Sequence, residues 1–200
     1  MSATAFHGIE GLAVDASGGL LASDSFDQRL LHFPSGSTTA DRVYGQGGSF
    51  TTGTSNNGGV SANSLSYPSL LVVDPGPAGG FYVVDAFNSR VLHFTGTSTT
   101  ADTVWGQGGS FAANAANNGG VSASSLNLPT GVAVDSNHNM WVADRSNNRV
   151  LYFPSSAATP PGTPAPPTVM LALLGLAAAG LFLAGSRRLS GRGSPTRSLL

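Results

Sequence analysis

Three acid–arginine pairs recur along the chain with the same internal spacing. In each pair an aspartate precedes an arginine by five positions, and most of the residues between them favour turns. A carboxylate and a guanidinium on either side of a tight turn can form a charge-assisted hydrogen bond, or can bind the turn amides. We therefore interpret the pairs as structural repeat residues, with a ring of arginines that binds anionic groups as the functional alternative. The pairs are Asp24 with Arg29, Asp85 with Arg90, and Asp144 with Arg149.

A second set of aspartates ends another short segment of each copy. These residues are Asp15, Asp74 and Asp135, at positions where aspartate commonly caps a turn. A calcium site needs several oxygen ligands that converge on one point, and one acid per copy does not establish such a site. We therefore predict turn caps here and no metal.

The remaining groups that could do chemistry do not form a catalytic pattern. His32 and His93 hold the same position in two copies, and Tyr152 holds it in the third, which predicts interchangeable half-buried side chains. Zinc needs three or four ligands brought together, and the serines lack the Gly-x-Ser-x-Gly elbow of many hydrolases. There is also no cysteine. We predict no catalytic residues, no metal and no cofactor, so the protein is expected not to be an enzyme, and its ligand-binding residues stay unidentified.

Composition and charge narrow the class of partner. Charged residues make up 10% of the 200 residues, compared with about 25% in ordinary soluble domains, and there are 27 glycines. Residues 1–168 hold five arginines and all ten acidic residues, a net charge of −5, and the other four arginines follow them. Phosphate contacts need clustered positive charge, so we predict no nucleic-acid partner.

Short runs of β-branched and aromatic residues surround these positions. Three such runs separated by turn-formers occur in each copy, and the first two copies add a fourth run that ends in Gly-Gln. The copies cover about residues 8–46, 67–107 and 128–153, a period of about 60 that is typical of propellers and other repeat arrays. The sequence thus predicts an all-β fold of about three four-stranded antiparallel blades, a partial propeller whose third blade lacks the Gly-Gln strand.

Two long segments rich in Gly, Ser and Asn connect the copies. Residues 47–66 and 108–127 share the strings GGSF and NNGGVSA. Loops of this length are usually functional or disordered. Their apolar residues could instead pin each loop to its blade, and we favour this packing role over a ligand-facing one. These residues are Phe50, Val60 and Leu65, with counterparts Phe111, Val121 and Leu126.

The composition changes after Phe153. Residues 154–168 form a proline-rich linker, residues 169–185 are apolar and long enough for a transmembrane helix, and residues 186–200 form a basic tail. A buried soluble helix is the alternative. Positive residues tend to stay cytoplasmic, so we expect a single-pass membrane protein with a cytoplasmic tail and an extracytoplasmic repeat region.

Export of the repeat region would need a signal that the sequence does not show. Residues 1–7 lack the basic start and apolar centre of a secretory signal. The chain is therefore either a fragment of a longer exported protein, which we favour, or a tail-anchored protein with cytoplasmic repeats.

The repeated pattern resembles the NHL repeat, the blade unit of a β-propeller. The resemblance is carried by PTGVAVD at residues 129–135, MWVAD at 140–144 and NNRV at 147–150, and it extends over about residues 8–153. The connecting segments resemble a longer variant found in bacterial surface proteins. Family propellers usually close with about six blades, so the resemblance implies that three blades form an open arc or that a homodimer closes the ring.

The family resemblance implies a binding or scaffolding function. We expect a membrane-anchored, extracytoplasmic module that mediates protein or ligand interaction, attached to the membrane through residues 169–185. Its protein or carbohydrate partner is not identified by the sequence. The alternative is a propeller-type hydrolase or lyase whose catalytic residues lie in missing blades, and a third possibility is a truncated product without activity of its own.

Overall fold

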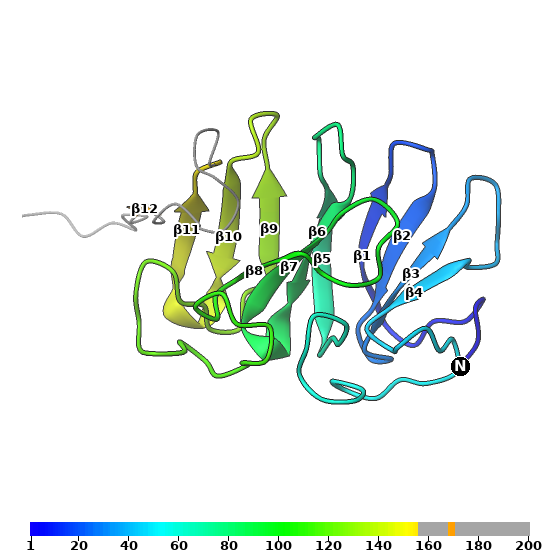
Figure 1. Ribbon diagram of the computed structural model, residues 1–200, viewed down its shortest axis with the longest axis horizontal. Helices are drawn as coiled ribbons and strands as arrows, with labels where there is room; N and C mark the ends of the chain where they lie inside the picture. The colour runs from blue at the N-terminus through cyan, green and yellow to red at the C-terminus, as the bar shows by residue number, and fades with distance from the viewer. Residues whose placement is uncertain (156–167, 171–200) are drawn as a thin grey trace, which may run out of the picture.

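The computed structural model describes residues 1–155 and 168–170. These residues form three four-stranded antiparallel sheets, which we call blades 1, 2 and 3, and Figure 1 shows them side by side. Blade 1 contains β1 (Ile9–Val14), β2 (Leu20–Asp24), β3 (Arg29–Phe33) and β4 (Arg42–Tyr44). Blade 2 contains β5 (Pro68–Val73), β6 (Phe81–Asp85), β7 (Arg90–Phe94) and β8 (Thr103–Trp105), with the 3-10 helix η1 (Ala86–Asn88) between β6 and β7. Blade 3 contains β9 (Gly131–Val134), β10 (Met140–Asp144), the 3-10 helix η2 (Arg145–Asn147), β11 (Arg149–Phe153) and β12 (Thr168–Met170).

The predicted all-β repeat of propeller-like blades is confirmed. In each blade the strands follow the chain order, and β5 contacts both β1 and β9, so the first strands of the blades are neighbours. Each first strand precedes a turn and a second strand, because its β-branched run ends at Asp15, Asp74 or Asp135 and is followed by turn-forming residues. The turns between the second and third strands therefore all lie at the other end of the blades.

Two apolar layers between the blades form most of the core. The layer between blades 1 and 2 includes Leu30 and Leu92, and the layer between blades 2 and 3 includes Val91 and Leu151. Leu92 and Val91 are neighbours on β7 and enter different layers because successive side chains of a strand point to opposite faces. A strand buried on both faces needs apolar side chains at consecutive positions, which explains why Val91 and Leu92 are adjacent in β7.

Residues of the long loops complete these layers. Leu65 and Leu126 are fully buried, and Phe50 and Phe111 pack against core residues, so the packing role predicted for them is confirmed. Gly45 permits this arrangement, since its φ is +91° and a Cβ there would lie 2.9 Å from the Leu65 side chain. Val121 is 68% exposed, and the packing prediction is wrong for this residue.

The third blade differs from the prediction at its edge. A fourth strand is present, because β12 pairs with β11 and places Val169 opposite Leu151. Val169 and Met170, which we assigned to the start of a transmembrane helix, thus lie in a strand, where the unpaired edge of β11 supplies hydrogen-bonding partners. The rest of that predicted helix, residues 171–185, the tail, and linker residues 156–167 lie outside the described residues. In the described part of the chain, no helix has the length and apolar character needed to cross a bilayer.

Candidate functional site

The buried pair of blade 2 shows what the repeated aspartates and arginines do. Arg90 and Asp85 are both completely buried, and Arg90 Nε donates to Asp85 Oδ2 over 2.7 Å. Arg90 Nη2 donates to the carbonyl oxygens of Ser61 and Ser64, in the loop that enters the blade. Its Nη1 donates to the carbonyl oxygen of Phe111, in the loop that leaves it, over 2.7 Å. One guanidinium therefore holds a hairpin and two loops together.

Both oxygens of the Asp85 carboxylate also accept hydrogen bonds. Its Oδ1 accepts the backbone N–H of Ser66 over 2.6 Å, and its Oδ2 also accepts Asn88 Nδ2 over 2.8 Å. Burial raises the pKa of Asp85, while Arg90, Asn88 and the Ser66 amide act in the opposite direction. The pair satisfies the two buried charges with several hydrogen bonds, as buried ion pairs require.

We call each acid–arginine pair, together with the loop carbonyls that its arginine binds, a hub. The hubs of blades 1 and 3 have the same geometry as that of blade 2, with one difference. Arg29 Nε donates to Asp24 over 3.0 Å, and its two Nη atoms donate to the carbonyl oxygens of Phe50 and Ala5. Arg149 Nε donates to Asp144 over 2.7 Å, and its Nη2 donates to the Ser125 carbonyl. The Arg149 side chain is 12% exposed, compared with 0% for Arg29 and Arg90, and the described residues provide no partner for its Nη1.

Paired asparagines attach the long loops to the following blade. Asn56 and Asn88 exchange two amide hydrogen bonds of 2.9 and 2.7 Å, and Asn117 and Asn147 do the same over 3.0 and 2.7 Å. This pairing accounts for the first asparagine of the Asn-Asn repeated in both loops, and the second donates to the carbonyl oxygen of Gln46 or Gln107. The loops therefore present a preformed surface rather than free chains.

The strand-end aspartates and the histidines form a second set of contacts at the opposite end of the blades. His93 Nδ1 lies 2.8 Å from Asp102 Oδ1, and its Nε2 lies 3.0 Å from Asp74 Oδ2. Both ring nitrogens of His93 therefore face a carboxylate. His138 of blade 3 also reaches Asp74, over 2.9 Å. His93 is 9% exposed and His32 is 3% exposed, so they are more buried than we predicted, since each is enclosed by two aspartates.

The same aspartates cap the turns that follow them. Asp15 Oδ1 accepts the backbone N–H groups of Ser17 and Gly19, each over 2.8 Å. Partial burial acts to raise the pKa of Asp15, but hydrogen bonds from Ser17, Gly19 and His32 outweigh it and lower the pKa to about 2. Similar hydrogen bonds lower the pKa of Asp135 and, against burial, those of Asp41 and Asp102. Within residues 1–155 and 168–170, no group of three or more acidic or histidine side chains is arranged to hold a metal ion.

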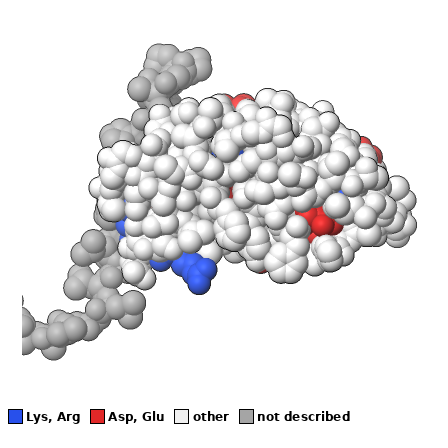
Figure 2. All heavy atoms as spheres, turned by 90° about the horizontal axis from the view of Figure 1, so that it is seen from below, with Lys and Arg blue, Asp and Glu red and all other residues white. Residues whose placement is uncertain are grey.

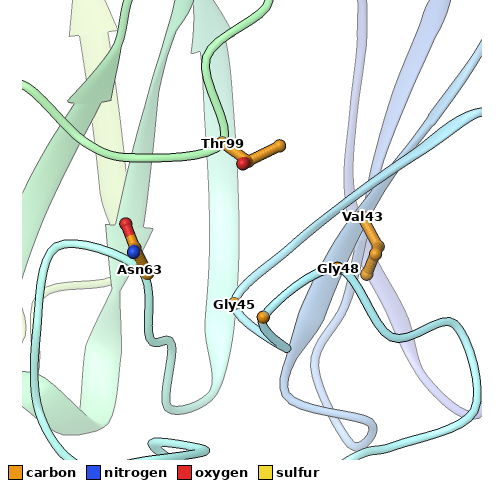
Figure 3. A pocket seen from close by; sticks show the side chains of 6 residues that line it. Val43, Gly45, Gly48, Asn63 and Thr99 are labelled. Atoms are coloured by element: carbon orange, nitrogen blue, oxygen red, sulfur yellow. The ribbon is translucent and has the colours of Figure 1, made fainter.

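A pocket of about 250 Å³ lies between blades 1 and 2. Figure 3 shows Asn63 and Thr99 on one side and β4 with its following glycines on the other. The lining offers an amide, a hydroxyl and backbone groups, and none of its residues is charged. The lining residues are Val43, Gly45, Gly47, Gly48, Asn63 and Thr99.

A row of aromatic side chains crosses the junction between blades 1 and 2. It lies at the hub end, by which we mean the end of the blades with the turns between the second and third strands. We call Phe26, Tyr67 and Phe87 the aromatic row. Tyr67 and Phe87 are stacked with their ring centroids 4.6 Å apart, and Phe26 is tilted against Tyr67 at 5.9 Å. Phe26 is 59% exposed and Phe87 is 57% exposed. Figure 2 views the molecule from this end, and most of the surface there consists of uncharged side chains.

Glu10 of β1 is joined to the aromatic row. Tyr67 Oη donates to Glu10 Oε1 over 2.5 Å, and this hydrogen bond raises the pKa of Tyr67. The pairing of β1 with β2 shifts register between Ile9 and Leu12, and such bulges change the direction of a side chain. Tyr67 has a φ of +55°, and Leu128 at the same position in blade 3 has a φ of +47°. The left-handed backbone is therefore shared by the two blades, and only the tyrosine side chain distinguishes blade 2 at this position.

The sequence reasoning did not single out these four residues. Two signals were present. Glu10 is the only glutamate of the chain, and Phe26 and Phe87 hold a turn position at which the third copy has Ser146. The residues of this junction are therefore recognised because they differ between the copies, whereas the hub residues are recognised because they are the same in all copies.

Comparison with known proteins supports the blade assignment. A family model described as the NHL repeat matches residues 126–153, which include β9, β10 and β11. The protein thus carries an NHL repeat in a chain whose sheets are arranged as propeller blades. No curated protein matches the chain.

Several solved structures are similar to it. A streptogramin B lyase has 12% identity and a TM-score of 0.48, over 74% of this chain and 38% of that one. A catalytically inactive virginiamycin B lyase from Staphylococcus aureus, solved with quinupristin, has 12% identity and a TM-score of 0.48, over 81% of this chain and 40% of that one. An auxiliary nutrient binding protein from Bacteroides thetaiotaomicron has 18% identity and a TM-score of 0.49, over 70% and 35%. The chain therefore spans at most 40% of the length of these three structures.

Proposed function

We propose that this protein is a non-enzymatic binding or scaffolding module of NHL-type blades, held at a membrane by the apolar segment that follows Met170, with its blades on the extracytoplasmic side. In this proposal the blades are a rigid frame and the partner binds at the hub end of the junction between blades 1 and 2. The aromatic row is the centre of that surface.

The binding role is supported by a contrast between the side chains that repeat in every blade and those that do not. The polar side chains that repeat between blades, such as Asp85 and Arg90, are buried and hold strands and loops in place. Side chains that do not repeat in blade 3, such as Phe26 and Phe87, are more than half exposed. Exposed aromatic groups on a rigid frame are common features of interaction surfaces.

A site-specific crosslinking experiment tests the binding role. A photoreactive phenylalanine analogue replaces Phe87 in the full chain in cells, and the matched control carries it at Ser146, the same turn position in blade 3. We expect a crosslinked adduct from position 87 and none from position 146. An adduct that contains two copies of the chain would identify the homodimer as the partner. Equal adducts at both positions, or none at either, would contradict the proposed binding surface.

The membrane arrangement is supported by the sequence alone, through the apolar segment and the arginines that follow it. Because the chain has no cysteine, single cysteines can report its topology. We expect Val121→Cys, at a 68% exposed site, to react with a membrane-impermeant maleimide on intact cells. Ser198→Cys in the tail should react only after permeabilisation. The reverse pattern would place the blades in the cytoplasm and refute this part of the proposal.

A further inference from the structure

We propose that the aromatic row and Glu10 together bind an organic cation, such as a quaternary ammonium group or a methylated lysine side chain. This inference rests on the proposed binding function and names the chemical class of its ligand. It is carried by the geometry of four side chains from two blades. Glu10 and Phe26 come from blade 1, and Tyr67 and Phe87 come from blade 2.

The rings provide the surface for a cation. The face of an aromatic ring is electrically negative, and it attracts a cation that lies within about 6 Å of its centroid. In the stacked pair, Phe87 covers one face of Tyr67 and remains 57% exposed itself. Phe26 also contacts Tyr67, with its ring tilted by 56° and the centroids 5.9 Å apart, and is 59% exposed. The row is thus continuous and open to solvent.

Glu10 provides the charge. All nine aspartates of the chain lie within the described residues, and each accepts hydrogen bonds that cap a turn, close a hub or enclose a histidine. In the described part of the chain, Glu10 forms no ion pair, and its one side-chain hydrogen bond comes from Tyr67. That bond occupies Oε1 and holds the carboxylate beside the row, which leaves Oε2 available for a ligand.

The surroundings favour a cation over an anion or a neutral sugar. Arg29 and Arg90, which each follow a phenylalanine of the row by three positions, are fully buried and hydrogen-bonded to Asp24 and Asp85, so their charges are already compensated. Residues 1–168 carry a net charge of −5, which attracts cations over the range of a Debye length, about 8 Å at physiological ionic strength. A neutral ligand would gain from the rings and could donate a hydrogen bond to Glu10, but it would lack the attraction between opposite charges.

Ligand-observed NMR on the full chain, in a polyoxyethylene detergent where one is needed, tests the assignment with choline as the probe. The neutral control is 3,3-dimethylbutan-1-ol, which has the same shape without the charge. We expect choline to bind with a Kd on the order of 1 mM, the affinity expected of a few exposed contacts. The neutral analogue should bind at least five-fold more weakly.

Variants separate the two parts of the site. Glu10→Gln removes the charge and Phe87→Ser introduces the residue that blade 3 has at this turn, and each should weaken choline binding about five-fold or more. Val121→Ser, at an exposed site on the second long loop, should leave binding unchanged. Equal binding of choline and its neutral analogue, or unchanged binding in Glu10→Gln, would overturn the assignment. Binding of a methyl pyranoside without choline would also overturn it, and crosslinking at position 87 would then still support the binding role.

Discussion

Blades 1 and 2 differ from blade 3 at three corresponding places, although all three share strand order and hub. The hub arginines of the first two blades are fully buried, whereas Arg149 is partly exposed. His32 and His93 lie between two aspartates, whereas Tyr152 packs on Trp141 with the ring centroids 5.1 Å apart. The turn phenylalanines are replaced by Ser146. The residues that repeat in all three blades thus build the blade, and the residues that differ between blades are candidates for a function of one particular blade.

The hub comparison predicts the largest effect. Arg90→Ala leaves the buried Asp85 carboxylate without its cation and releases two loops, so we expect a loss of about 3–5 kcal/mol in the free energy of unfolding. Arg149→Ala should cost about 1–3 kcal/mol, because Arg149 is partly exposed and holds fewer described groups. Urea unfolding followed by tryptophan fluorescence measures both. Arg145→Ala, an exposed site, should stay within about 0.5 kcal/mol of the parent. Equal losses at Arg90 and Arg149 would show that the hubs do not differ.

The aspartates that contact the histidines predict an intermediate effect, a dependence of stability on pH through Asp15. The pKa of Asp15 is about 2 in the folded protein and 3.8 as its ordinary value. A lowered pKa gives stability that is present above pH 3.8 and is lost as the pH falls through 2. Allowing for partial exposure, this contribution is about 1 kcal/mol. Urea midpoints between pH 5 and pH 2 should fall less steeply in Asp15→Asn than in the parent. An identical slope in the two proteins would contradict the role of Asp15.

The junction comparison predicts the smallest effect on stability. The double substitution Leu128→Tyr and Ser146→Phe would place three rings across the junction of blades 2 and 3, with Phe87 as the third. Ser69, which corresponds to Glu10, is buried and uncharged, so this second row would lack a carboxylate. We expect a change in unfolding free energy of no more than about 0.5 kcal/mol, and one choline site per chain as before. Two equivalent sites would show that rings alone suffice.

The agreement between sequence and structure was greatest where the copies repeat. The Asp-x4-Arg spacing indicated a carboxylate and a guanidinium across a turn, and Arg90 Nε does contact Asp85. The sequence could not show that Phe111 completes this hub, because the contact joins residues 21 apart and uses a backbone carbonyl, which every residue has. It also did not predict β12, since the edge of β11 accepts a strand through backbone groups that every residue has.

The sequence by itself determined the local elements of this protein. β-branched runs, turn-formers and a period of about 60 residues are enough to define three blades, because strand and turn preferences act between near neighbours in the chain. The tertiary structure alone decided which exposed groups meet. Glu10 and Tyr67 are 57 residues apart and come together because β1 and β5 are adjacent first strands of neighbouring blades. The proposed cation site therefore depends on the packing of two blades, which no pattern within one copy contains.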